Sequence, residues 1–308
     1  MGKTELGPIR LEPVYKKAVW AGDRLKRIRG LAEDGIGISR EVCAYRGSEN
    51  RVEEGPFRGQ GIDQVIADFH QALMGQDGSD QLVRVAYMDT REDLSIQVHP
   101  NEAQARAAGD FEKSESWYIL EADEGAYITA GVECPDKDIL RKAAESGDME
   151  RYLVRIPVKA GDFAMIPAGM VHACGKHMLA LEVGSFGGIT YRLYDYGRGR
   201  PLDLDKGFAI LDPSLRCEIA HAQEKLPGRP RALVRHRLFG VDVLDVADSW
   251  VLKEYGGYRI LCCVEGECRV VGAGEEYPLS YTGTILIPAS CGPVEIRGSA
   301  RLLIAWKP

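Results

Sequence analysis

The amino-acid sequence predicts a mainly β fold of two jelly-roll barrels with a few inserted helices. Its apolar runs are short, rich in β-branched and aromatic residues, and bounded by Gly, Pro and Asp, which is the pattern of antiparallel strands. Glycine is abundant, with 35 residues among 308, and this length suits two ordinary domains. A succession of strand, turn and strand also occurs twice along the chain. Together these observations predict two β barrels.

Four apolar runs are the clearest predicted strands, namely 82–88, 116–120, 163–167 and 258–264. Helical signals are fewer. In 62–73 the apolar residues recur with the 3.6-residue period of a helix, and 136–153 follows Pro135 with an apolar face of its own. We therefore expect two helices inserted beside the β core.

The internal repeat pairs 117–183 with 258–306. Each copy has a strand, a Glu-Gly turn, and a second strand that begins near Gly and ends in Ile-Pro-Ala. These are recurrent pieces of a cupin-type jelly roll, which both halves resemble. Five residues past this proline the first copy has His172, whereas the second has Pro293. Because a proline ring cannot bind a metal, we expect chemistry in the first barrel only.

A segment without periodicity, 224–231, is charged and rich in Pro and Gly, which is typical of a linker. We therefore predict a catalytic, metal-binding cupin domain with helical insertions over 1–225. A second, metal-free cupin-like domain is predicted over 232–308.

Charge and hydropathy exclude two classes of partner. The 39 basic and 46 acidic residues give a net charge of −7, and no basic cluster is long enough to follow a phosphate backbone, so nucleic acid is not expected. No segment approaches the roughly 20 apolar residues that span a bilayer, so a membrane is not expected either. The N-terminus lacks the apolar run of a secretory signal, which predicts a cytoplasmic protein. The sequence leaves the oligomeric state open.

Four residues in three segments form a candidate metal site. Gln97 and His99 are two apart in an alternating strand and therefore project from one face. Taken alone, this pair would be interpreted as part of a polar strand edge, with a histidine whose hydrogen bonds are already made. Glu115, at the start of another strand, and His172, after a tight Gly turn, add a carboxylate and a second imidazole. In a jelly-roll context this set of N and O ligands favours a Zn²⁺ site.

Several motifs in order make a family resemblance specific. They are 8–15 with Trp20, 94–100, 113–118, 166–173 and 190–198. In these segments, whose span covers about two thirds of the chain, the sequence resembles a type I mannose-6-phosphate isomerase (phosphomannose isomerase) of the short bacterial kind.

The resemblance implies a zinc-dependent enzyme that interconverts mannose 6-phosphate and fructose 6-phosphate, with a small-molecule sugar phosphate as its partner. It implies two catalytic-site residues, Arg192 as a catalytic group and Lys113 as a substrate contact. The zinc ligands that it implies are the four residues already selected, Gln97, His99, Glu115 and His172.

These residue types suit an aldose–ketose isomerase, which moves a proton between C1 and C2 through an enediolate whose oxyanion needs a positive neighbour. Zn²⁺ with one carboxylate and three neutral ligands keeps a positive charge and can act as a Lewis acid. Arg192 is then expected to hold the open-chain sugar or the enediolate, and Lys113 to hydrogen-bond a sugar oxygen or attract phosphate. The alternative for both is a solvated surface charge. Arg198 and Arg200 could meet the phosphate, but we expect them to be solvated loop charges.

Two segments depart from the family pattern and keep other functions open. Where the family usually carries Gln-x-Ser-Asp, 184–189 has three glycines and no acid. Where many members have Gly-Glu-x-Trp, this sequence has Ile38 in place of the acid and Arg40 in place of the tryptophan. One alternative is an isomerase of another sugar or sugar phosphate, and a second is a non-catalytic cupin that binds a sugar phosphate. A cupin dioxygenase would favour iron bound by histidines and a carboxylate. The amide ligand, Lys113 and Arg192 fit an anionic sugar better.

Overall fold

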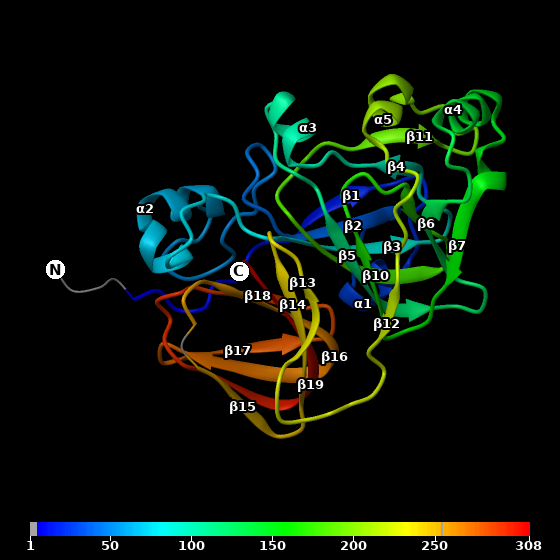
Figure 1. Ribbon diagram of the computed structural model, residues 1–308. Coiled ribbons are helices and arrows are strands. Elements are labelled where there is room, and N and C mark those ends of the chain that lie inside the picture. The colour runs from blue at the N-terminus through cyan, green and yellow to red at the C-terminus, as the bar shows by residue number, and fades with distance from the viewer. Residues whose placement is uncertain (1–4, 254) are drawn as a thin grey trace. The chain divides into compact units, whose positions relative to one another are not determined.

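The computed structural model describes residues 5–253 and 255–308, and it is mainly β, as the sequence predicts (Figure 1). The helices are α1 (Arg24–Arg29), α2 (Ile62–Met74), α3 (Glu102–Ala107), α4 (Lys137–Ser146), the 3₁₀ helix η1 (Met149–Tyr152) and α5 (Leu204–Ile210). The strands are β1 (Val14–Lys17), β2 (Ile36–Val42), β3 (Arg84–Thr90), β4 (Ile96–Val98), β5 (Glu115–Ala122), β6 (Tyr127–Val132), β7 (Leu153–Pro157), β8 (Asp162–Ile166), β9 (His172–Cys174), β10 (Met178–Gly184), β11 (Tyr191–Tyr194), β12 (Ile219–His221), β13 (Arg231–Arg235), β14 (Gly240–Val246), β15 (Ser249–Leu252), β16 (Arg259–Gly272), β17 (Glu275–Ser280), β18 (Thr284–Ile287) and β19 (Val294–Trp306).

The described strands form three antiparallel sheets. Their orders are β1-β2-β3-β10-β5-β8-β12, β11-β4-β9-β6-β7, and β13-β14-β19-β16-β17 with β15 on β19 and β18 on β16. In the five-stranded sheet β4 lies between β9 and β11, so strands that are far apart in sequence become neighbours. Such order is typical of jelly rolls.

Helix α5 determines which face of β4 is free for chemistry. It contacts β4 and β11, and its Phe208 belongs with Ile96 and Val98 to one buried hydrophobic cluster. Because successive residues of a strand face opposite sides, Gln97 projects from the other face. The alternation in the sequence thus correctly separates packing residues from a polar one.

The helix predicted over 62–73 is confirmed as α2, but the helix predicted over 136–153 is too long. The structure divides that segment into α4 and η1. Asp136 caps α4 by accepting hydrogen bonds from two backbone amides, and Gly147 ends it with a left-handed φ of 84°.

Within the described residues, none of the helices combines the length and the hydrophobicity of a membrane-spanning segment.

The chain divides into two compact units that are not consecutive in sequence. One comprises Arg40–Ala86, Ala222–Pro308 and the described part of Met1–Val14, and the other comprises Tyr15–Ser39 and Tyr87–His221. The sequence predicts a single domain over 1–225, whereas the structure assigns two segments within that range, 40–86 and the described part of Met1–Val14, to the unit of Ala222–Pro308.

Hydrogen bonds between distant residues explain this difference. Ile9 exchanges both backbone hydrogen bonds with Leu286, at 2.8 and 2.9 Å, and the Ala289 amide donates to the Leu73 carbonyl at 2.9 Å. The Val83 amide donates to the hydroxyl of Tyr258 at 2.8 Å. Pairing between residues so far apart leaves no local pattern in a sequence. The Pro- and Gly-rich segment 224–231 is a local pattern, and it therefore determined where the boundary was predicted.

A buried ion pair fastens the start of Ala222–Pro308 to its own barrel. The side chains of Arg301 in β19 and Asp245 in β14 are only 4% and 5% exposed, and Arg301 Nε lies 2.6 Å from Asp245 Oδ1. Arg301 also donates to the carbonyls of Ala222 and Glu224. Asp245 accepts a hydrogen bond from the Leu226 amide at 2.9 Å. Both partners therefore hold 222–226 in place.

Removing one partner of this pair should strongly destabilise the protein, because it leaves a buried charge without compensation. We expect Arg301→Ala to lower the free energy of unfolding by about 3–5 kcal/mol, measured by urea denaturation. Arg297→Ala is the matched control. Arg297 lies in the same strand but is 52% exposed and pairs with Glu295, where an ion pair contributes about 0–1 kcal/mol.

The pH dependence of stability gives a second check on the same pair. Burial acts to raise the pKa of Asp245, but its hydrogen bonds with Arg301 and the Leu226 amide outweigh burial and hold the pKa below its usual range. A carboxyl whose pKa is lower in the folded state stabilises above its unfolded pKa, about 3.9 for Asp. The difference in the free energy of unfolding between the wild type and Arg301→Ala should therefore become smaller below about pH 4. An equal loss of stability in Arg297→Ala would contradict this role of the buried pair.

Candidate metal centre

Strand pairing places three of the predicted site residues in one row. Gln97 in β4 is opposite His172 in β9, and Arg192 in β11 is opposite Gln97. Residues directly opposite each other in an antiparallel pair point to the same face of the sheet. Arg192, Gln97 and His172 therefore share the face that α5 leaves free.

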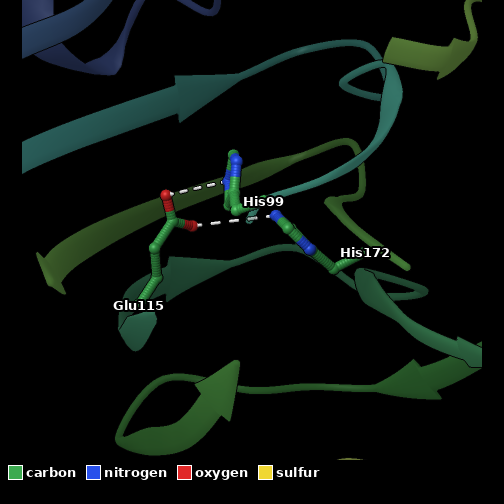
Figure 2. Close-up of side chains that lie close together, drawn as sticks. All are labelled: His99, Glu115 and His172. Carbon is green, nitrogen blue, oxygen red and sulfur yellow. Dashed lines mark ion pairs between the residues drawn. The ribbon is translucent and has the colours of Figure 1, made fainter. Parts of the chain in front are cut away.

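His99, Glu115 and His172 form a compact buried cluster (Figure 2). Each residue is 1% exposed, and their ligand atoms lie within 4.8 Å of one another. His99 Nε2 is 3.2 Å from Glu115 Oε1, and His172 Nε2 is 3.8 Å from Glu115 Oε2. Glu115 begins β5 in the sheet that holds β10 and β8, so its carboxylate reaches the imidazoles from the opposite sheet of the same unit.

Gln97 lies beside this cluster. Its side-chain amide nitrogen is 3.4 Å from His172 Nε2. All four residues that the sequence selected as metal ligands are thus neighbours in the structure, although they come from three separate segments.

Backbone carbonyls orient both imidazole rings. His99 Nδ1 lies 3.0 Å from the Ile189 carbonyl oxygen, and His172 Nδ1 lies 2.8 Å from the Met170 carbonyl oxygen. A carbonyl oxygen only accepts, so Nδ1 carries the proton in each neutral ring and Nε2 keeps its lone pair. Metal-binding histidines are held in this way.

The protonation states of the cluster suit metal ligands. Burial, together with the nearby Lys113 ammonium, lowers the pKa of His99 to about 3, and burial lowers the pKa of His172 below its usual range. Burial acts to raise the pKa of Glu115, but the Lys113 charge and the neighbouring imidazoles hold that pKa well below its usual range. At neutral pH the cluster therefore consists of two neutral imidazoles and one carboxylate, the forms that bind metals.

Three polar atoms of the cluster have no hydrogen-bond partner within the described part of the chain, namely His99 Nε2 and both carboxylate oxygens of Glu115. Their nearest ionisable neighbours are one another, His172 and Lys113, at distances of 2.8 to 3.8 Å. Buried polar atoms without partners are rare and costly. Because these atoms converge, and because Zn²⁺ takes imidazole nitrogen and carboxylate oxygen, the donor set fits a divalent metal.

Of the two predicted catalytic-site residues, Lys113 contacts this cluster, and Arg192 lies opposite Gln97 in the β11–β4 register. Lys113 Nζ is 2.8 Å from Glu115 Oε1 and 3.3 Å from the Thr190 hydroxyl, and the Lys113 side chain is only 12% exposed. Arg192 donates from Nη1 to the Pro201 carbonyl at 2.9 Å. Its buried Nε has no hydrogen-bond partner among residues 5–253 and 255–308. Lys113 is therefore not the solvated charge of the alternative interpretation.

Arg198 and Arg200 also differ from the solvated charges that the sequence suggested. Both converge on buried Asp195: Arg198 Nη2 lies 3.0 Å from Oδ1, and Arg200 makes a bidentate pair at 2.5 and 2.8 Å. Their side chains are 22% and 28% exposed. Two guanidinium groups facing one carboxylate leave a positive charge held in a defined place.

Sequence reasoning missed the polar residues that support Glu115. The Ser114 hydroxyl donates to the Glu112 carboxylate and accepts from the Ala168 amide, each at 3.0 Å. The Ser185 hydroxyl donates to the Glu112 carbonyl at 2.7 Å and accepts from the Ser114 amide at 2.9 Å. None of these residues has the spacing of a metal ligand or a catalytic motif, so no signal in the sequence distinguished them.

Comparison with known proteins assigns the family. Residues 231–306 match the family model described as mannose-6-phosphate isomerase, cupin domain. The chain is 30% identical to the mannose-6-phosphate isomerase ManA of Bacillus subtilis over 312 residues, which cover 97% of this chain and 98% of that protein. This chain belongs to the mannose-6-phosphate isomerase family.

Solved structures of mannose-6-phosphate isomerases share its fold. The crystal structure of the Bacillus subtilis enzyme matches with a TM-score of 0.85 at 26% identity, covering 98% of this chain and 100% of that chain. A mannose 6-phosphate isomerase bound with zinc and yttrium matches with a TM-score of 0.76 at 16% identity, over 98% of this chain and 100% of that one. The predicted fold of two cupin-type jelly-roll barrels with inserted helices is confirmed.

Proposed function

We propose that this protein is a zinc-dependent isomerase that interconverts mannose 6-phosphate and fructose 6-phosphate through an enediolate. Membership of the family supports an isomerase. The observation that carries the metal is the buried cluster of His99, Glu115 and His172, in which His99 Nε2 and both carboxylate oxygens of Glu115 lack hydrogen-bond partners within the described chain. Gln97 would complete the set as a neutral fourth ligand through its amide oxygen.

The residues around the metal have separable tasks in this proposal. When bound, zinc would supply a Lewis acid toward the oxygen on C1 or C2 of the sugar. Glu115 provides one negative charge among three neutral ligands, which leaves the site positive. Arg192 shares a sheet face with Gln97, so its guanidinium can donate to the oxyanion that develops in the enediolate. Lys113, close to Glu115, can donate to a sugar oxygen.

The arginines beside Arg192 support a phosphorylated substrate over a free sugar. Arg198 and Arg200 carry two positive charges against the single charge of Asp195, and their side chains remain partly exposed. Guanidinium groups bind phosphate oxygens through charge-assisted hydrogen bonds. Arg192 is close to both arginines along the chain, and its Nη1 donates to the carbonyl of Pro201, the residue that follows Arg200.

A coupled isomerase assay on metal-analysed protein tests the proposal. Protein stripped by a chelator is expected to lose more than about 100-fold in kcat with mannose 6-phosphate, because it loses the group that stabilises the oxyanion. Adding Zn²⁺ back should restore the rate. Free mannose, which lacks the phosphate, serves as the control substrate and is expected to react more slowly.

Two outcomes would replace the proposal with a specific alternative. Turnover of other sugars, but not of mannose 6-phosphate or fructose 6-phosphate, would favour an isomerase of another sugar or sugar phosphate, consistent with the altered segment 184–189. Binding of a sugar phosphate without any turnover by metal-replete protein would favour a non-catalytic cupin.

A further inference from the structure

The segment that departs from the family pattern, 184–189, lies directly behind a candidate metal ligand. The carbonyl of Ile189 accepts a hydrogen bond from His99 Nδ1 at 3.0 Å. This hydrogen bond selects the tautomer of His99 and the orientation of its ring. The position of the Ile189 backbone therefore matters for the metal centre.

Asp110 holds that backbone. Its Oδ2 accepts hydrogen bonds from the amides of Gly188 and Ile189, each at 2.9 Å. Asp110 is itself anchored just after α3, where its amide donates to the Ala105 carbonyl at 2.9 Å. Its Oδ1 is buried and has no hydrogen-bond partner among the described residues. The hydrogen bonds that Asp110 makes through its side chain therefore go to these two backbone amides.

Gly187 lets this segment lie close against the backbone of Phe111 and Glu112. A Cβ atom on Gly187 would lie 2.3 Å from the Phe111 carbonyl oxygen and 2.9 Å from the Glu112 carbonyl carbon. The Gly187 amide donates to the Glu112 carbonyl at 3.1 Å. Any side chain at 187 would therefore push the segment away from 110–112. The glycine permits the close approach that brings Asp110 to the next two amides.

We propose that Asp110 is a positioning residue for the metal centre, acting on His99 through the backbone of Ile189. This inference rests on the metal site of the proposed function. Two charge-assisted hydrogen bonds fix the Ile189 backbone, its carbonyl fixes the proton on His99 Nδ1, and the lone pair of Nε2 is then directed toward Glu115. Without Asp110, the segment rich in glycine can move and the ring loses its fixed orientation.

Zinc affinity, measured by competition with a chromogenic chelator and without substrate, tests this role. Asp110→Ala is expected to weaken Zn²⁺ binding by about 10–100-fold, the range for outer partners of metal ligands. Asp110→Asn should retain most of the affinity, because its side-chain oxygen can still accept from the two amides. The ¹⁵N chemical shifts of the metal-free imidazoles should show a single Nδ1-protonated tautomer of His99 in the wild type and a mixture in Asp110→Ala.

Asp136→Ala is the matched control. Asp136 also accepts hydrogen bonds from two backbone amides, those of Asp138 and Ile139, at 2.8 and 3.1 Å, but it caps α4 and contacts no candidate ligand. Its loss should reduce stability and leave zinc affinity unchanged. Wild-type affinity in Asp110→Ala, or an equal loss in Asp136→Ala, would overturn the positioning role alone. A wild-type protein that binds no zinc would overturn the proposed metal site as well.

Discussion

His172→Ala is expected to lose zinc binding and isomerase activity together. His172 is 1% exposed, and its Nε2 lies among the atoms of Glu115 and Gln97. Loss of an outer partner costs about 10–100-fold in metal affinity, so loss of a direct ligand should cost more than about 100-fold. We expect kcat to fall by at least about 10²–10³-fold, as when an oxyanion donor is removed. Elemental analysis and the coupled assay measure both effects.

His221→Ala provides the control for this experiment. His221 lies in β12 of the same compact unit, pairs with Asp162 at 2.7 Å, and has a side chain that is 63% exposed. Its removal should change neither metal content nor activity. If His172→Ala kept the metal affinity of the wild type, the assignment of the ligand set would be wrong.

Arg192→Ala is expected to lower kcat by about 10²–10³-fold with a smaller change in KM. Its backbone is fixed opposite Gln97 by the β11–β4 register, and its buried Nε has no partner in the described structure. A donor held in place near the proposed metal should contribute most when the oxyanion forms. Lys113→Ala should instead act mainly on KM, because a charge that attracts the substrate stabilises ground state and transition state alike.

Steady-state kinetics of both variants, each checked for zinc content, separate these roles. The zinc check matters most for Lys113, because its Nζ lies 2.8 Å from the candidate ligand Glu115. Arg216→Ala is the control for charge, since Arg216 donates at the surface to the carbonyls of Pro213 and Leu215. An Arg192→Ala enzyme with the wild-type kcat and a raised KM would assign Arg192 to substrate binding.

Much of the candidate site could be predicted because its signals are local. Alternation in 95–99 separates Ile96 and Val98 from Gln97, and the structure packs the first two in the cluster that includes Phe208 of α5. The period of 62–73 likewise predicts α2. The same logic failed for 136–153, where the predicted helix extended past Gly147, whose left-handed backbone ends α4.

Local patterns were enough to predict the mainly β fold, the family and the residue types of the candidate metal centre, because strand alternation and motifs depend on residues that are near one another along the chain. That 40–86 joins the unit of Ala222–Pro308 became visible in the folded chain alone. The tertiary structure also decided that Arg198 and Arg200 converge on Asp195, and that Ile189 and Asp110 stand behind His99. The contacts behind His99 join side chains to backbone groups about 80 to 90 residues away in the chain, and nearly every residue carries the same amide and carbonyl. Which of them meet depends on how the strands and loops pack, and no local pattern records it.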